Sequence, residues 1–143
     1  VYLSQVTQNE CIADATEHWR RNKGRCNGSM YWQFNDCWGV CSWSSLDYYG
    51  NYKALQYGAK HFNAPLSISI ENTSDYIRVF VLNDLNESKT ADAEYEIFDF
   101  ENGTLETNKK TLTVGAVKNS VVFDLNVVHD ILNVSSIYQV GKT

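Results

Sequence analysis

The sequence predicts an α+β chain: a helix, a buried strand and a second helix, followed by an immunoglobulin-like antiparallel β-sandwich. Composition changes near Pro65, the one proline among 143 residues. All four tryptophans and all four cysteines precede it, whereas alternating Val, Ile, Tyr and Phe between Asn, Gly and Ser turns follow it. We therefore expect residues 1–64 and residues 65–143 to form separate domains.

The first helix is predicted from its start and stop signals. Thr7-Gln8-Asn9-Glu10 has the form of a capping box, in which the first and last side chains satisfy each other's backbone N–H groups. Gly24 is a natural helix stop, because glycine readily takes the left-handed conformation. These signals predict a helix over about residues 8–23.

A strand and a second helix are predicted next. The nearly continuous apolar run at residues 28–34, GSMYWQF, is typical of a strand covered on both faces. The segment 52–62 places Leu55, Ala59 and Phe62 on one stripe of a helix.

The region after Pro65 alternates apolar and polar residues, as half-buried strands do. The predicted strands are residues 66–70, 76–83, 91–100, 105–114, 120–125 and 136–140. An immunoglobulin-like sandwich usually has seven strands. We therefore expect an incomplete sandwich, with a terminal strand cut off, absent or supplied from elsewhere.

Composition narrows the possible partners. The net charge of −5 and the pI near 5.1 argue against nucleic acid, which needs clustered Lys and Arg. No apolar run approaches the roughly 20 residues that cross a bilayer, so no membrane partner is expected. The spacing of Cys11, Cys26, Cys37 and Cys41 fits neither a zinc site nor a disulfide framework. We expect buried free thiols, and neither a metal nor another cofactor.

The segment YWQFNDCWGVCSW, residues 31–43, has the chemistry of a sugar-binding site. Tryptophan faces can stack on the apolar C–H face of a sugar ring, while amide and carboxylate groups bind its hydroxyls. An aromatic core fits these residue types equally well. No pair of catalytic carboxylates and no Ser-His-Asp or Cys-His grouping can be argued from the sequence.

Residues 29–71, SMYWQFNDCWGVCSWSSLDYYGNYKALQYGAKHFNAPLSISIE, resemble the β-mannosidase branch of glycoside hydrolase family 2. That branch runs from its last barrel strand into the next domain through the pattern YWQ-ND-W---SW-S-DY-G-WKALHY-AK-F-APL. Gly39, Asn51-Tyr52 and Gln56 depart from the pattern. The resemblance implies that residues 1–64 are the last strand and flanking helices of a (β/α)8 barrel, and that residues 65–143 are the sandwich.

The resemblance implies part of a retaining exo-β-mannosidase, which removes terminal non-reducing β-D-mannose from oligosaccharides. Both catalytic glutamates are expected upstream of Val1, so the chain alone should be inactive. The alternatives are another family 2 exo-glycosidase, a β-glucosaminidase or β-galactosidase, or a non-catalytic carbohydrate-binding or spacer module.

The resemblance also implies site residues. Trp32 is expected to form the wall or floor of the mannosyl subsite, with Asn35, Asp36 and Trp38 as further sugar contacts. It implies a non-proline cis peptide bond after Trp32, which we expect the segment to lose on its own. We also expect the chain to self-associate through exposed barrel surfaces. Free cysteines and no visible export signal favour a bacterial cytoplasm and leave a lysosomal or secreted location open.

Overall fold

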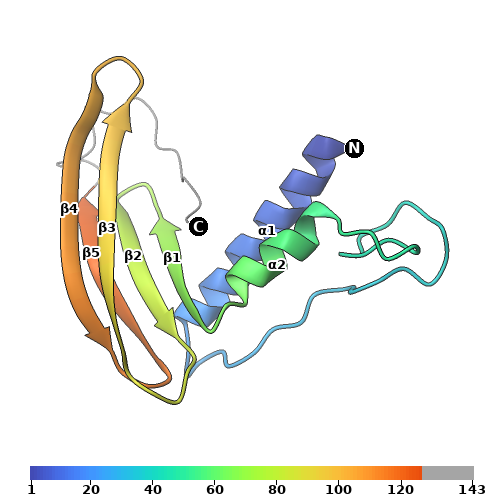
Figure 1. Ribbon diagram of the computed structural model, residues 1–143, viewed down its shortest axis with the longest axis horizontal. Coiled ribbons are helices and arrows are strands. Elements are labelled where there is room, and N and C mark those ends of the chain that lie inside the picture. The colour runs from blue at the N-terminus through green and yellow to red at the C-terminus, as the bar shows by residue number, and fades with distance from the viewer. Residues whose placement is uncertain (127–143) are drawn as a thin grey trace. The chain divides into compact units, whose positions relative to one another are not determined.

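The computed structural model describes residues 1–126, which fall into two compact units. The chain divides between Ser69 and Ile70. Two helices lie in the first unit and antiparallel strands dominate the second (Figure 1). This order confirms the predicted α+β class. The predicted strand 136–140 lies outside the described residues, and the assignment of the two units to barrel and sandwich stays a prediction.

The first helix, α1, spans Tyr2–Arg21 and begins well before its predicted start. Val1 is the N-cap, and its carbonyl accepts hydrogen bonds from the backbone of Gln5 and the hydroxyl of Ser4. The predicted capping box at Thr7 is therefore wrong. No proline or glycine precedes Thr7, so nothing stops the helix from extending toward the N-terminus.

The second helix, α2, spans Ala54–Phe62 and confirms the predicted apolar stripe. Leu55, Ala59 and Phe62 are buried, and Ile12 and Ala13 of α1 pack against them. The two helices run side by side within the first unit (Figure 1). This cluster is the hydrophobic core of that unit.

The C-terminal end of α2 is held by a cation from α1. The Arg20 guanidinium donates to the carbonyls of Phe62 and Ala64 and to the hydroxyl of Ser67. The distances to Ala64 and Ser67 are 2.8 and 3.0 Å. Helix carbonyls at a C-terminus lack partners within the helix, so a guanidinium there both satisfies them and complements the dipole.

The segment 28–34 is not a strand, which corrects the prediction. Residues 28–34 contain neither a strand nor a bridge, and the isolated bridges that follow join Asn35 to Leu46 and Leu46 to Tyr52. A buried parallel strand needs neighbouring strands on both sides. Met30 is 98% exposed, so this segment is not covered as a core strand would be. The Trp32–Gln33 peptide bond is cis, so the expected loss of that bond is also wrong.

Five strands form two antiparallel sheets. The chain enters the first sheet, crosses to the second as a hairpin, and returns beside β2, giving the strand orders β1-β2-β5 and β3-β4. The strands are β1 Leu66–Asn72, β2 Tyr76–Asn83, β3 Lys89–Asp99, β4 Gly103–Val114 and β5 Lys118–Asn126.

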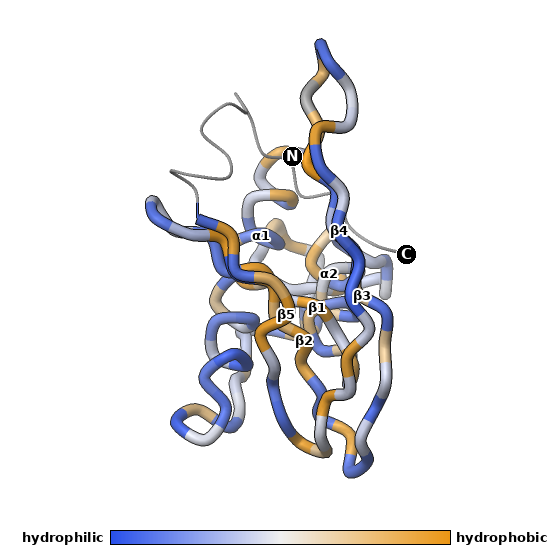
Figure 2. The backbone as a smooth tube through the Cα atoms, turned by 90° about the vertical axis from the view of Figure 1, so that its left-hand side faces the viewer, coloured by the Kyte–Doolittle hydropathy of each residue, from blue (hydrophilic) through white to orange (hydrophobic). Residues whose placement is uncertain are grey.

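The core of the second unit joins the two sheets. Val81 and Val122 from one sheet cluster with Ala93 and Val114 from the other, and Phe123 completes the group. Hydrophobic residues are dense along β2 and β5, whereas β4 is largely hydrophilic (Figure 2). Most of β4 is correspondingly exposed. The packing of two sheets over one core is that of a β-sandwich.

The cysteines are free thiols, but they are not the buried ones that the sequence predicted. Cys11, Cys37 and Cys41 are exposed and Cys26 is partly buried. The prediction failed because it rested on the general tendency of free cysteine to be buried. Three of these four lie on exposed positions of α1 and of the segment between the helices.

Candidate functional site

The site candidate is the irregular segment of residues 31–53 that joins the two helices. Its backbone is folded back on itself: Leu46 N–H donates to the Phe34 carbonyl at 2.8 Å, and Ser45 N–H donates to the Gln33 carbonyl at 3.0 Å. Lys53 N–H then donates to the Ser45 carbonyl at 2.9 Å. Three stretches of chain are thus tied together beside the start of α2.

Two serines stand at the centre of this fold and are fully buried. The Ser45 hydroxyl donates to the Phe34 carbonyl at 2.8 Å, and the Ser44 hydroxyl donates to the Leu46 carbonyl at 2.6 Å. Both side chains are fully enclosed, with no exposed surface. A small hydroxyl side chain can donate to buried carbonyls where no regular backbone hydrogen bonding between strands exists.

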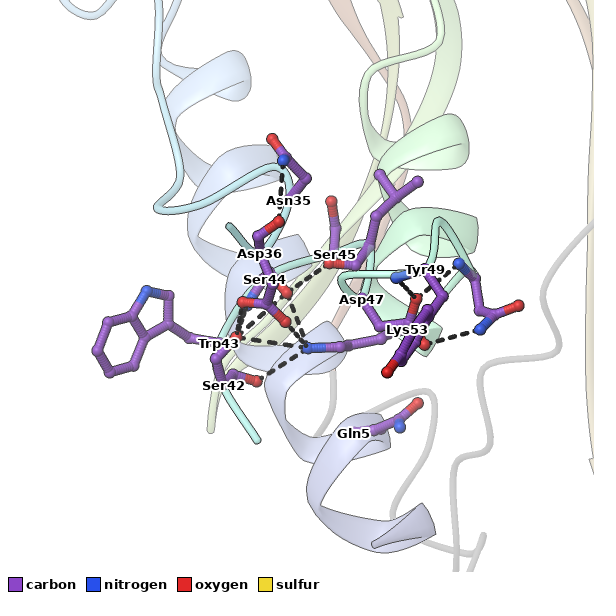
Figure 3. A network of polar contacts seen from close by, with 12 residues as sticks. Gln5, Asn35, Asp36, Ser42, Trp43, Ser44, Ser45, Asp47, Tyr49 and Lys53 are labelled. Atoms are coloured by element: carbon purple, nitrogen blue, oxygen red, sulfur yellow. Dashed lines mark hydrogen bonds and ion pairs between the residues drawn. The ribbon is translucent and has the colours of Figure 1, made fainter. Parts of the chain in front are cut away.

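A buried ion pair anchors one end of the segment. Lys53 Nζ lies 3.2 Å from Asp36 Oδ2, and the Asp36 side chain is only 1% exposed. The same ammonium donates to the Ser44 hydroxyl at 2.8 Å and to the Ser42 carbonyl at 3.3 Å. The Ser42 hydroxyl donates to the other carboxylate oxygen of Asp36. Figure 3 shows Lys53 reaching into the middle of this group.

These contacts lower the pKa of Asp36. The hydrogen bond from Ser42 is the main cause, and those from Ser44 and Lys53 act in the same direction, while burial opposes them. A carboxylate that accepts several hydrogen bonds beside an ammonium is favoured in its charged form. Asp36 is therefore held ionised.

The second acid of the segment, Asp47, closes a turn. Its Oδ1 accepts from the backbone N–H groups of Tyr49 and Asn51, at 2.9 and 2.8 Å, and its Oδ2 accepts from the Asn51 amide at 2.8 Å. The Asn51 side chain is the main cause of a lowered pKa at Asp47. A general acid needs a raised pKa, so neither Asp36 nor Asp47 is suited to that role.

The tryptophans of the segment point outward. Trp32, Trp38 and Trp43 are 74%, 66% and 59% exposed. The Trp43 indole extends away from the Lys53 ammonium in Figure 3. Tyr31, by contrast, packs edge-on against Phe62 with ring centroids 6.4 Å apart. Tyr31 therefore belongs to the core, whereas the three tryptophans are largely exposed to solvent.

Helix α1 contacts the segment and the start of α2 through two glutamine side chains. The Gln8 amide donates to the Trp43 carbonyl at 2.6 Å. The Gln5 side chain accepts from the backbone N–H of Ala54 at 3.1 Å. Neither Gln5 nor Gln8 was predicted from the sequence to contact this segment.

The predicted site residues divide into two kinds. Trp32, Asn35 and Trp38 are exposed, and the Asn35 amide donates to the backbone carbonyl of Asp36. Asp36 is buried, with both carboxylate oxygens already bonded within the chain. A sugar contact by any of the four stays a prediction.

Sequence reasoning missed the residues that hold Asp36: Lys53, Ser42 and Ser44. Lys53 and Ser42 match specified positions of the family pattern, but 17 residues separate Lys53 from Asp36. No local pattern links positions so far apart.

Two features are absent from the described part of the chain, a cluster of metal-ligating side chains and a membrane-spanning helix. Within residues 1–126, no cluster of three or more His, Cys, Asp or Glu could hold a metal ion. No helix in the described part of the chain is long and apolar enough to span a membrane.

The chain is similar in sequence and in structure to known β-mannosidases. No protein-family model matches it. It is 48% identical over 73 residues to the β-mannosidase of Bos taurus, an alignment that covers 46% of this chain. It is 45% identical over 75 residues to β-mannosidase B of Thermothelomyces thermophilus, covering 49% of this chain. A solved β-D-mannosidase from Dictyoglomus thermophilum superposes on 92% of the chain with a TM-score of 0.77 and 31% identity.

The chain belongs to the β-mannosidase family. It spans only a small part of these relatives, 8% of the Bos taurus protein, 9% of the Thermothelomyces protein and 16% of the Dictyoglomus chain. An exo-chitosanase from Amycolatopsis orientalis is also similar, with a TM-score of 0.70 and 26% identity over 82% of this chain and 14% of that one. The fold of this β-mannosidase-family segment therefore also occurs in an enzyme with another name.

Proposed function

We propose that the chain is part of a retaining exo-β-mannosidase that removes terminal non-reducing β-D-mannose from oligosaccharides. Residues 1–64 would be the last strand and flanking helices of its barrel, and residues 65–143 its sandwich. The observation that carries the proposal is the segment between α1 and α2, where three exposed tryptophans stand on a backbone fixed by buried polar contacts, in a chain of the β-mannosidase family.

The segment would supply binding and not the bond-breaking step. Retaining glycosidases need two carboxyl groups about 5 to 5.5 Å apart, one of them able to act as an acid. Asp36 is paired with Lys53, and Asp47 accepts hydrogen bonds within its own turn. The pKa values of both carboxyl groups are lowered. The catalytic glutamates would therefore come from parts of the parent protein outside this chain.

Trp32, Asn35 and Trp38 are the proposed sugar contacts. The two indoles would stack on the apolar face of a mannosyl ring, and the Asn35 amide would bind a hydroxyl. We do not extend this role to Asp36, because its carboxylate oxygens already have partners. Asp36 would instead support the segment from beneath.

A panel of aryl glycosides tests the specificity of the parent protein. The full-length protein should hydrolyse aryl β-mannoside in preference to aryl β-glucosaminide and aryl β-galactoside. Preference for the glucosaminide would favour the activity suggested by the similar exo-chitosanase. No hydrolysis of any member, with saturable binding of manno-oligosaccharides by the 143-residue chain, would indicate a non-catalytic module.

A matched pair of variants tests the sugar contact. Trp32→Ala should raise KM for aryl β-mannoside by about tenfold, the effect of losing one strong stacking contact. Trp19→Ala is the control, because Trp19 is an exposed indole on α1 outside the segment. Equal effects of the two substitutions would contradict a role for Trp32 in the sugar site.

The bacterial cytoplasmic location stays a prediction. Relatives named above come from cattle and from a fungus. Three exposed free cysteines fit a compartment in which thiols stay reduced. Fractionation of the source organism, followed by detection of the full-length protein, would test this location against a lysosomal or secreted one.

A further inference from the structure

The ammonium of Lys53 is an unusual feature of the segment, because it is nearly enclosed. The Lys53 side chain is 14% exposed, and the paired Asp36 side chain 1%. Lysine seldom buries its charge unless it is paired. Here Nζ has oxygen neighbours on Asp36, Ser42 and Ser44.

The oxygens around Lys53 come from both ends of one short turn. Asp36 stands before the turn and Ser42 and Ser44 stand after it, while Trp38 lies within it and Trp43 between the two serines. One cation therefore holds the two ends of the turn together. The Trp43 indole extends away from the Lys53 ammonium (Figure 3), and the Trp38 side chain is exposed.

Lys53 also connects the turn to a rigid element. It is the N-cap residue of α2, and its own backbone N–H donates to the Ser45 carbonyl at 2.9 Å. Leu55, two residues later, is fully buried in the helical core. Both the main chain and the side chain of Lys53 therefore fix the turn relative to the start of α2.

We propose that Lys53, paired with Asp36, is a positioning residue for the sugar site, because it sets the turn that carries the proposed sugar contact Trp38. The inference rests on the proposed function. Lys53 acts through the Trp38 indole and does not touch the substrate. A guanidinium would not replace it, because its planar fork suits paired acceptors and not a compact group of oxygens on three sides.

The test uses the full-length protein that contains this segment, with aryl β-mannoside as substrate. Lys53→Met keeps the length of the stem and removes the ammonium, leaving the Asp36 carboxylate buried without its cation. KM should rise about tenfold or more with kcat changed much less, because misplaced binding groups weaken binding while the catalytic carboxylates lie elsewhere. Lys60→Met, an exposed lysine in the last turn of α2, is the control and should leave KM unchanged.

Two more variants separate positioning from loss of folding. Asp36→Asn combined with Lys53→Met removes both charges and should recover part of the lost affinity, because no unpaired charge then stays buried. Ser44→Ala removes one acceptor and should raise KM in the same direction by a smaller factor. All variants are compared by thermal unfolding, so that a change in KM is scored only for folded protein.

The possible outcomes are distinct. A wild-type protein that does not hydrolyse the mannoside overturns the proposed function, and this inference with it. A wild-type protein that is active, with Lys53→Met and Ser44→Ala folded and unchanged in KM, overturns the role of Lys53 alone. A raised KM that the double variant partly restores supports it.

Discussion

Asp36 illustrates how one buried carboxylate can make the stability of the first unit depend on pH. Its pKa lies below the usual 3.8, mainly because the Ser42 hydroxyl donates to it. A group whose pKa is lower in the folded state stabilises the fold at pH values above its unfolded pKa. That stabilisation is lost as the pH falls through the folded pKa.

Asp36→Asn should therefore cost stability at neutral pH and much less in acid. We expect the free energy of unfolding of the variant to lie below that of the wild type at pH 6, and the difference to shrink as the pH falls below 3.8. Urea unfolding at several pH values measures this difference. Asp14→Asn, at an exposed acid on α1, is the control for the removal of one carboxylate. A difference in unfolding free energy between the wild type and Asp36→Asn that stays constant down to pH 2.5 would contradict the lowered pKa of Asp36.

The residue scale also shows where the sequence is informative. The tryptophans, Asn35 and Asp36 could be singled out by type, because aromatic and amide groups suit a sugar. Whether each faces solvent could not be predicted: Asp36 is buried and Trp38 is exposed, although they are two positions apart. The difference depends on Lys53, which reaches Asp36 only after the chain has turned back.

At the scale of elements, the contact between the helices depends on a glycine. A Cβ on Gly58 of α2 would lie 1.6 Å from Oδ1 of Asn9 on α1. The Asn9 amide donates to Glu10 Oε1 at 3.1 Å, while its buried Oδ1 has no hydrogen-bond partner. Gly58 therefore leaves the room that the Asn9 amide occupies.

Gly58→Ala should be destabilising alone and stabilising when Asn9 is also replaced. Alanine stabilises a helix by about 1 kcal/mol relative to glycine. Here, however, its methyl group would displace the Asn9 amide. In the Asn9→Ala background that obstacle is gone. We expect a coupling free energy of about 1 to 3 kcal/mol between the two sites, measured by urea unfolding of the two single variants and the double variant. Additive effects would show that the amide moves aside without cost.

The elements differ in how far the sequence could predict them. The stripe of Leu55, Ala59 and Phe62 was confirmed because helical periodicity is a local property. The segment 28–34 was predicted as a strand and is not one, because a strand exists only where another strand pairs with it. The start of α1 was missed because a capping box was read as a boundary when the helix could continue through it.

At the scale of the whole molecule, the described chain has two separate hydrophobic cores. One consists of residues from the two helices and Tyr31, and the other of residues from β2 to β5. The composition of the sequence changes near Pro65, and the structure divides after Ser69. Their assignment to a barrel and a sandwich rests on the resemblance and stays a proposal.

The exposed apolar side chains of the first unit should cause self-association. Met30 and Phe34 are 98% and 59% exposed beside the exposed Trp32. Exposed apolar side chains that lie near one another often mark a surface for protein interaction. Sedimentation velocity of the 143-residue chain should show an apparent mass that rises with concentration. Met30→Gln combined with Phe34→Ser should lower that association, and a wild-type chain that stays monomeric up to high concentration would contradict the expectation.

The most direct test of the account compares the full-length protein with the 143-residue chain in one assay, the hydrolysis of aryl β-mannoside. We assign binding groups to this chain and the catalytic glutamates to the rest of the protein. We therefore expect hydrolysis by the full-length protein and none above the uncatalysed rate by the chain. Hydrolysis by the chain alone, or a folded full-length protein with no activity on the mannoside, would contradict it.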